Sequence, residues 1–240
     1  MYGEDFSRIY DEYGWNVYAE LFSVRLLRWI KDERIPVRSA VDLGCGTGVL
    51  CRALADAGFH VTGVDLSSFM IDCARAYGGS VSYFVDDMVS FRPAHSCDLV
   101  TCTGDALNHL PSFGLIRRLF SNVFGYLAPG GWLVFDLLDP REAESAEKVE
   151  LFNEGGRSGT FSIALGQHGA VSLAITVAED GHPLFSETIQ ETVYDPADIC
   201  NALQEAGFIG VSSAHHLSAK DPDEAVTWFI RACKPFSNTV

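Results

Sequence analysis

Apolar residues in the first 138 positions form short runs that alternate with stretches of helical spacing. In two stretches, residues 16–31 and the segment that follows Ser112, apolar side chains recur every three to four positions, which predicts amphipathic helices. The apolar runs predict strands at 39–43, 58–64, 132–138 and at the starts of segments 81–88 and 97–110. Strands that alternate with helices indicate an α/β fold with a mostly parallel sheet.

The same pattern returns near the C-terminus. Asp195 followed by Pro196 is typical of a helix N-cap and first helical position, and Gly207 marks the end of that helix. Strands are predicted at 208–213 and 225–232. The core therefore comprises residues 1–138 and 195–240, and its sheet is expected to have seven strands.

Residues 139–194 lie between these halves and show the two-residue period of strands. Three alternating runs predict a small antiparallel sheet, with a hairpin turn at Asp180-Gly181 and a charged, helical lead-in at 141–150. An insertion that leaves the carboxyl end of the fifth strand emerges where ligands bind in open α/β sheets. We expect a substrate lid or a dimerisation element; a decoration without substrate contact is the alternative.

The segment Val-Asp-Leu-Gly-Cys-Gly-Thr-Gly at 41–48 carries the strongest functional signal. Its alternating glycines occupy a turn between a strand and a helix, where a ligand can approach the backbone closely. Val49 stands where a dinucleotide-binding turn has its third glycine. Asp42 would repel a pyrophosphate but suits a cationic ligand, so the turn favours a ligand other than a dinucleotide.

This turn resembles the first motif, D-x-G-x-G-x-G, of the class I S-adenosylmethionine-dependent methyltransferases, which implies a Rossmann-like sheet flanked by helices. Asp65 ends the second predicted strand, about 20 residues after Gly44, where an acid can bind both ribose hydroxyls. The resemblance implies that role for Asp65, and it implies that Asp87 and Met88 contact the adenine. Asp86 is an alternative to Asp87, and each acid could instead serve only a turn or a loop.

Further site residues follow from the resemblance. The N-terminal segment from Phe6 to Tyr13 resembles the family's short Y-D-x-x-Y segment and is expected to close over the cofactor, although its aromatic residues could simply pack a helix. His109, in the loop after the fourth strand, is the candidate catalytic residue, although it could instead bond to the backbone. The implied cofactor-binding residues are Tyr13, Asp42, Gly44, Cys45, Gly46, Asp65, Leu66, Met70, Asp87, Met88 and Thr103.

The net charge and the cysteine content restrict the classes of molecule that this protein is expected to bind. A formal net charge of −15 argues against nucleic acid and anionic membranes. The seven cysteines lack metal-ligand spacing, so we expect reduced thiols, no metal and a cytoplasmic protein without a membrane span. The expected partner is a small-molecule methyl acceptor, and homodimerisation stays open.

The function expected from this resemblance is methyl transfer from S-adenosylmethionine to a nitrogen or oxygen atom of a small molecule. The tetrapeptide Asn/Asp-Pro-Pro-Tyr/Phe, found in methyltransferases that act on nucleobases and on glutamine, is absent from the segment 97–110. The alternatives are a protein that binds the cofactor without transferring the methyl group, a nicotinamide-dependent oxidoreductase and an aminopropyl transferase. The sequence does not distinguish among acceptors.

Overall fold

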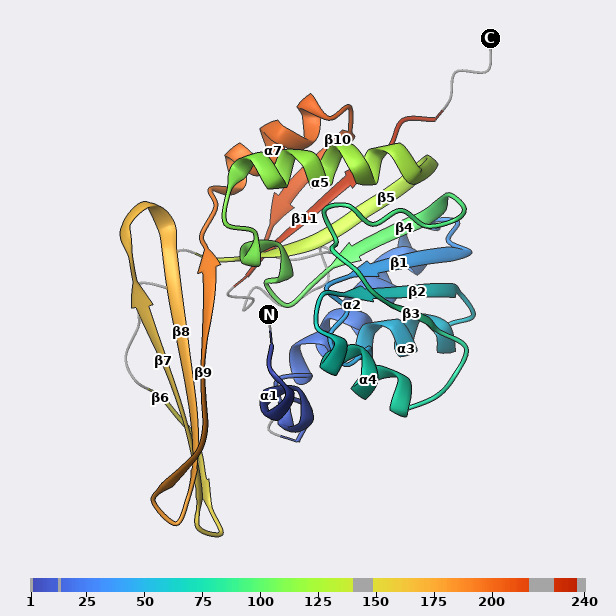
Figure 1. Ribbon diagram of the computed structural model, residues 1–240. Helices are drawn as coiled ribbons and strands as arrows, with labels where there is room; N and C mark the ends of the chain where they lie inside the picture. Colours follow the sequence, from blue (N-terminus) through green and yellow to red (C-terminus); the bar gives the residue numbers. More distant parts are fainter. Residues whose placement is uncertain (1, 13, 140–148, 216–226, 237–240) are drawn as a thin grey trace.

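The computed structural model describes residues 2–12, 14–139, 149–215 and 227–236 and is built around one large sheet (Figure 1). This sheet has seven strands in the order β10-β11-β5-β4-β1-β2-β3. The strands are β1 (Ser39–Leu43), β2 (His60–Asp65), β3 (Ser82–Val85), β4 (Cys97–Cys102), β5 (Leu127–Leu138), β10 (Ile209–Ala214) and β11 (Thr227–Cys233).

Five strands of the large sheet are parallel. β1 pairs with β2 and β4, β2 with β3, and β4 with β5, all in parallel register. β11 is antiparallel to both β5 and β10. The predicted α/β fold with a seven-stranded, mostly parallel sheet is therefore confirmed, and the carboxyl ends of the parallel strands meet at one edge.

Helices cover both faces of this sheet (Figure 1). The helices are α1 (Glu4–Ile9), α2 (Val17–Asp32), α3 (Val49–Asp56), α4 (Ser68–Ala76), α5 (Phe113–Tyr126) and α7 (Pro196–Glu205). Residues of α2, α3 and α4 share one buried cluster, and residues of α5 and α7 share another. Within the described part of the chain, no helix is long and apolar enough to cross a membrane.

The N-cap of α5 lacks a side-chain hydrogen bond, and β5 begins earlier than the strand predicted at 132–138. The side chain of Ser112 makes no capping hydrogen bond to α5, although this residue occupies the N-cap position. β5 begins at Leu127, because Leu127 already pairs with Cys97, and the register then shifts before Leu99. Pro129 and the two glycines after it therefore lie inside the strand, at an irregularity. The predicted cap of α7 is confirmed, since the Asp195 side chain accepts a hydrogen bond from Ala197 N at 2.7 Å.

A second, antiparallel sheet projects from the core (Figure 1). Its four strands are β6 (Val149–Glu154), β7 (Arg157–Leu165), β8 (Ala170–Glu179) and β9 (His182–Thr192), in that order, with the short helix η2 (Gln167–Gly169) between β7 and β8. The predicted hairpin turn is present, and Asp180 and Gly181 both have positive φ.

β6 is the strand that the alternation did not predict. Its register against β7 shifts between Glu150 and Phe152, which breaks the two-residue period. Residues 149 and 150 of the predicted helical lead-in belong to this strand, which corrects the prediction there, and residues 141–148 of the lead-in lie outside the described residues. β9 contacts α1 and the short helix η1 (Ala106–His109). The second sheet is therefore attached to the core through β9.

Candidate active site

The glycine-rich turn joins β1 to α3 and holds its backbone in the left-handed region. Gly44, Gly46 and Gly48 have φ values of 70°, 52° and 78°. A Cβ atom on Gly44 would lie 2.7 Å from Cβ of Ala106, whereas one on Gly46 would meet no atom within 4 Å. Gly44 therefore allows η1 to pack against the turn, and Gly46 leaves open space above the backbone.

Asp65 is fixed beside this turn from the end of β2. Its Oδ2 accepts a hydrogen bond from Gly46 N at 2.9 Å, and its Oδ1 accepts one from Ser67 N at 2.8 Å. Burial raises the pKa of this carboxyl group. Each carboxylate oxygen can accept more than one hydrogen bond, so Asp65 retains the capacity to bind two neighbouring hydroxyl groups.

Asp42 is buried within the sheet. It accepts hydrogen bonds from Thr101 Oγ1 at 2.7 Å and from Cys51 Sγ at 3.4 Å, and burial raises its pKa to about 7. Part of its bonding capacity is thus used inside the protein.

The seven cysteines are all free, and Cys73 and Cys200 are only half-buried.

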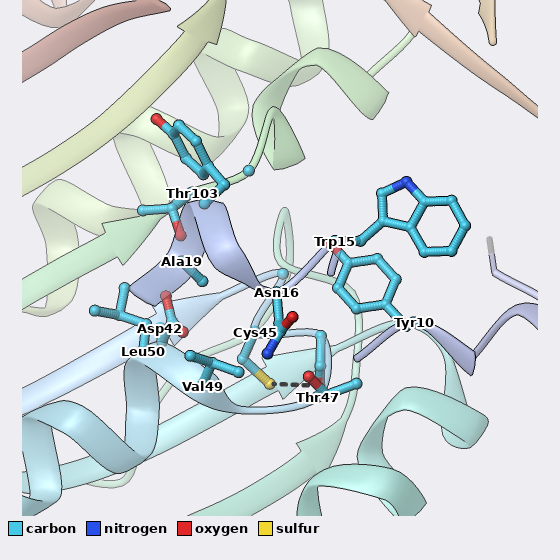
Figure 2. A pocket seen from close by; sticks show the side chains of 14 residues that line it. Tyr10, Trp15, Asn16, Ala19, Asp42, Cys45, Thr47, Val49, Leu50 and Thr103 are labelled. Atoms are coloured by element: carbon cyan, nitrogen blue, oxygen red, sulfur yellow. Dashed lines mark hydrogen bonds between the residues drawn. The ribbon is translucent and has the colours of Figure 1, made fainter. Parts of the chain in front are cut away.

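A cavity of about 50 Å³ lies above the turn (Figure 2). Typical small-molecule pockets hold about 300–1,000 Å³, so a ligand of nucleoside size requires the covering residues to move. The predicted residues Asp42, Gly44, Cys45, Gly46 and Thr103 line it, together with Tyr10, Trp15, Asn16, Tyr18, Ala19, Thr47, Val49, Leu50 and Gly104.

The N-terminal segment, residues 2–12 and 14–16, covers this cavity. Asp11 accepts hydrogen bonds from Thr47 Oγ1 at 2.7 Å and from Tyr77 Oη at 2.8 Å. The aromatic rings of Phe6, Tyr10 and Trp15 pack against one another. The segment is thus held by hydrogen bonds and ring packing, contacts that can be exchanged.

The other predicted cofactor residues have different positions. Leu66 is half-exposed beside Asp65, whereas Met70 is fully buried against Phe6. Asp86 and Asp87 are both exposed, and Asp87 accepts a hydrogen bond from Val89 N at 2.9 Å. Met88 packs on the main core, and Tyr13 lies outside the described residues. Cofactor contacts of these residues stay predictions.

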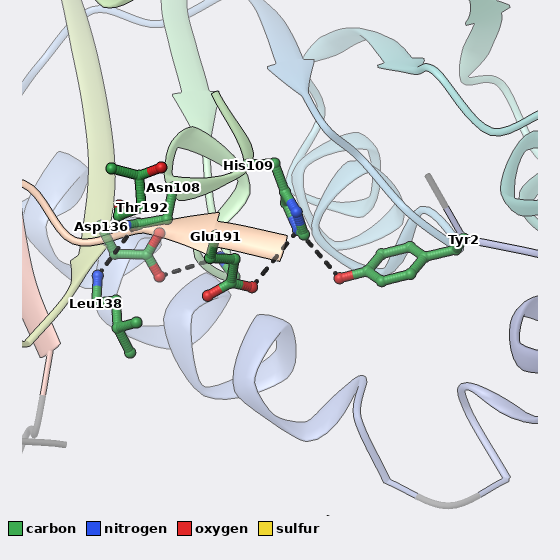
Figure 3. A network of polar contacts seen from close by, with 8 residues as sticks. Tyr2, Asn108, His109, Asp136, Leu138, Glu191 and Thr192 are labelled. Atoms are coloured by element: carbon green, nitrogen blue, oxygen red, sulfur yellow. Dashed lines mark hydrogen bonds and ion pairs between the residues drawn. The ribbon is translucent and has the colours of Figure 1, made fainter. Parts of the chain in front are cut away.

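His109 lies in η1, beyond the carboxyl end of β4 (Figure 3). Its Nε2 is 3.2 Å from Tyr2 Oη and 3.7 Å from Glu191 Oε1. Burial lowers its pKa to about 4, so the imidazole is neutral near pH 7. The adjacent Asn108 donates to Thr192 O at 2.8 Å and accepts from Leu138 N at 3.1 Å, which ties η1 to β9 and β5.

Two buried carboxylates beside His109 were missed by the sequence analysis. Asp136 of β5 is fully buried; its Oδ2 accepts a hydrogen bond from Gly104 N at 3.0 Å, and its Oδ1 has no partner. Glu191 of β9 is 6% exposed, and its Oε2 has no partner. Burial raises the pKa of Asp136 to about 6 and, with a smaller effect from Asp136, that of Glu191 to about 7.

The sequence did contain a signal for Glu191. Phe185 and Ile189 lie on one face of β9, and Glu191 falls on this face next to the buried Ile189, where an apolar residue is expected. Asp136 also gave a signal, because it is the one charged residue in the apolar run 132–138 of β5. Among the described residues, no group of three or more His, Cys, Asp or Glu side chains is arranged to hold a metal ion.

Comparison with known proteins places the site in a family. Residues 40–131 match the family model described as "Methyltransferase domain". The ubiquinone biosynthesis O-methyltransferase of Thiobacillus denitrificans is 35% identical over 127 residues, which are 50% of this chain and 52% of that protein. The chain thus spans about half the length of this curated relative.

Two solved structures share the fold. An S-adenosylmethionine-dependent methyltransferase from Clostridium acetobutylicum superposes with a TM-score of 0.81 at 20% identity, over 96% of this chain and 98% of that one. The amino pentose methyltransferase CalS10 from Micromonospora echinaspora gives a TM-score of 0.75 at 22% identity, over 97% and 98% of the two chains. The family model, with the glycine turn and Asp65 on this fold, confirms the resemblance: residues 40–131 form a methyltransferase domain similar to those of the class I S-adenosylmethionine-dependent methyltransferases.

Proposed function

We propose that this protein binds S-adenosylmethionine at the glycine turn and transfers its methyl group to a nitrogen or oxygen atom of a small molecule. The main support is the position of Asp65, which is bonded to Gly46 N beside a cavity at the carboxyl ends of the parallel strands. The relative from Thiobacillus denitrificans is named for O-methylation, and CalS10 for an amino pentose, so these names leave the acceptor atom open.

The residues present fit this cofactor. Asp65 has acceptor capacity for the two ribose hydroxyls, and the open space at Gly46 lets a ligand approach the backbone. Tyr10 and Trp15 line the cavity and present aromatic rings, which attract a cationic group such as a sulfonium. When bound, S-adenosylmethionine supplies an electrophilic methyl group.

The contribution of the protein to the reaction is orientation and the exclusion of water. Closure of the N-terminal segment over the cavity removes solvent from the site, and positioning of the acceptor is worth about 7–11 kcal/mol in well-aligned systems. His109 faces the acceptor side from η1, where its neutral ring can accept a hydrogen bond. It stays our candidate for a catalytic contact.

Isothermal titration of the purified protein with S-adenosylmethionine and, separately, with NAD tests this proposal. We expect S-adenosylmethionine to bind and NAD not to bind. Asp65→Ala should weaken the affinity for S-adenosylmethionine roughly 10–100-fold, because charge-assisted hydrogen bonds are lost. Asp56→Ala is the matched control, since Asp56 is exposed at the end of α3. Binding of NAD in place of S-adenosylmethionine, or equal affinities in wild type and Asp65→Ala, would contradict the proposal.

A further inference from the structure

Asp136 and Glu191 each bury a carboxylate oxygen without a hydrogen-bond partner. The unpartnered atoms are Asp136 Oδ1 and Glu191 Oε2, on side chains that are 0% and 6% exposed. A buried polar atom without a partner is costly, and a buried carboxylate without a counter-charge costs more. The Tyr18 hydroxyl interacts with Asp136, whereas no donor among the described residues bonds to Glu191 Oε2, which indicates that this oxygen meets a donor from outside the chain.

The surroundings of the two carboxylates supply no permanent positive charge. Among the described residues, neither carboxylate pairs with a lysine or an arginine. The titratable groups that face Glu191 are His109 from η1, Tyr2 from the N-terminal segment and Asp136 from β5. His109 is neutral near pH 7, so these groups leave a negative site that matches a cation or a group with several N–H donors.

The two carboxylates adjoin the cofactor cavity. Gly104 lines that cavity and donates its backbone N–H to Asp136, while Tyr18 lines the cavity with a hydroxyl group that interacts with the Asp136 carboxylate. Figure 3 shows the carboxylate of Glu191 between Asp136 and His109. The acidic site therefore lies between the proposed cofactor site and β9, on the side from which an acceptor would meet the methyl group.

We propose, on the basis of the function proposed above, that Glu191 and Asp136 bind the amino group of the methyl acceptor, which makes the acceptor a small amine and the reaction an N-methylation. An ammonium group offers three N–H donors for Glu191 Oε2 and a positive charge that offsets the negative charges of Glu191 and Asp136. An alcohol offers one donor and no charge, so it leaves at least one oxygen unpaired.

The site also provides the proton transfer that an amine requires. A bound R–NH₃⁺ gives one proton to the carboxylate of Glu191, leaving R–NH₂ and a neutral Glu191. The nitrogen lone pair then forms the bond to the methyl carbon, while the carbon–sulfur bond breaks and its electron pair goes to sulfur. The product R–NH₂–CH₃⁺ carries the positive charge that sulfur had, and Glu191 returns its proton to solvent when the site opens. Because its pKa is near 7, Glu191 is suited to this exchange.

The test uses a panel of aliphatic, aromatic and polyhydroxylated amines, each paired with the alcohol of the same skeleton, such as benzylamine and benzyl alcohol. S-adenosylhomocysteine formation is measured for wild type, Glu191→Gln and the control Glu179→Gln, whose half-exposed side chain on β8 pairs with Arg157. We expect amines to exceed their alcohols at least about 10-fold in kcat/KM, and Glu191→Gln to lower kcat/KM for the amine roughly 10–100-fold. The control should match wild type.

Two further measurements separate this proposal from a structural role and from the proposed function. At pH 8 without ligand, Glu191→Gln should raise Tm by roughly 2–4 °C, since it removes an unpaired buried charge. Its Kd for S-adenosylmethionine should stay within about twofold of wild type. Intact cofactor binding with no amine methylated, with alcohols preferred, or with full activity and a lower Tm in Glu191→Gln would overturn the proposal. Absence of cofactor binding in wild type would instead contradict the proposed function.

Discussion

At the scale of single residues, Gly44 and Gly46 of the same turn have different structural roles. Gly44 is confined by Ala106, and a Cβ atom there would overlap protein atoms. Gly46 has open space above it, and its N–H is held by Asp65. Both residues have positive φ, so the difference between them lies in what the absent side chain would contact.

Alanine substitutions at Gly44 and Gly46 should have different effects on stability and on cofactor affinity. Gly44→Ala combines a left-handed backbone with a steric overlap and should lower the free energy of unfolding by about 2–4 kcal/mol. Gly46→Ala should cost only about 1–2 kcal/mol but should weaken cofactor affinity, because its methyl group occupies the open space. Urea unfolding and calorimetric titration of both variants check this. Equal losses of stability in the two variants would show that the overlap at Gly44 is relieved at little cost.

At the scale of elements, the N-terminal segment is the part that must move. The cavity beneath it is too small for a nucleoside, and the segment is attached to the core through Asp11. It also contacts the second sheet, where Gly3 N donates to Glu187 Oε1 at 3.0 Å. Opening and closing of this segment would therefore control access to the turn.

Asp11→Ala should loosen this segment. Loss of the hydrogen bonds to Thr47 and Tyr77 should speed amide exchange in residues 4–12 and raise the dissociation rate of S-adenosylmethionine several-fold. Hydrogen exchange and stopped-flow dissociation measure these changes. Asp5→Ala is the control, because Asp5 is exposed on α1. Unchanged exchange in Asp11→Ala would mean that the other contacts of the segment, such as its aromatic packing and the Gly3–Glu187 hydrogen bond, hold it without Asp11.

The elements that sequence alone predicted are those with an uninterrupted hydrophobic period. The strands of the large sheet and the hairpin at Asp180 follow this rule, whereas β6 was missed because a register shift interrupts its alternation. The glycine turn and Asp65 were predicted because they come from one β-α-β unit. Glu191 was missed because it reaches Asp136 and His109 only through the return of β9 to the core, a contact that local patterns do not encode.

At the scale of the whole molecule, buried carboxyl groups link stability to pH. Burial raises the pKa of Asp42 and Glu191 to about 7 and that of Asp136 to about 6, above the values of an unfolded chain. The folded state therefore holds protons that the unfolded state releases. The stability that these protons contribute is lost as pH rises through the folded pKa values. His109, with its lowered pKa, acts in the opposite direction, mainly below pH 6.5.

The ligand-free protein should therefore lose stability between pH 6 and pH 8. Summed over these carboxyl groups, the decrease in the free energy of unfolding is on the order of 2–4 kcal/mol. Glu191→Gln should make this decrease smaller by about 1 kcal/mol. Chemical unfolding at several pH values measures the slope. A free energy of unfolding that rises over this range would show that the carboxyl groups are ionised at low cost in the folded state.

The central claim is methyl transfer, and the most direct measurement follows the methyl group itself. The protein is incubated with S-adenosylmethionine that carries an isotopically labelled methyl group and with a panel of amines, alcohols, phenols and carboxylates. The account predicts label in a small-molecule product, with one S-adenosylhomocysteine formed for each methyl group transferred. Binding of S-adenosylmethionine without any labelled product across the panel would contradict the account and favour a protein that binds the cofactor without transferring its methyl group.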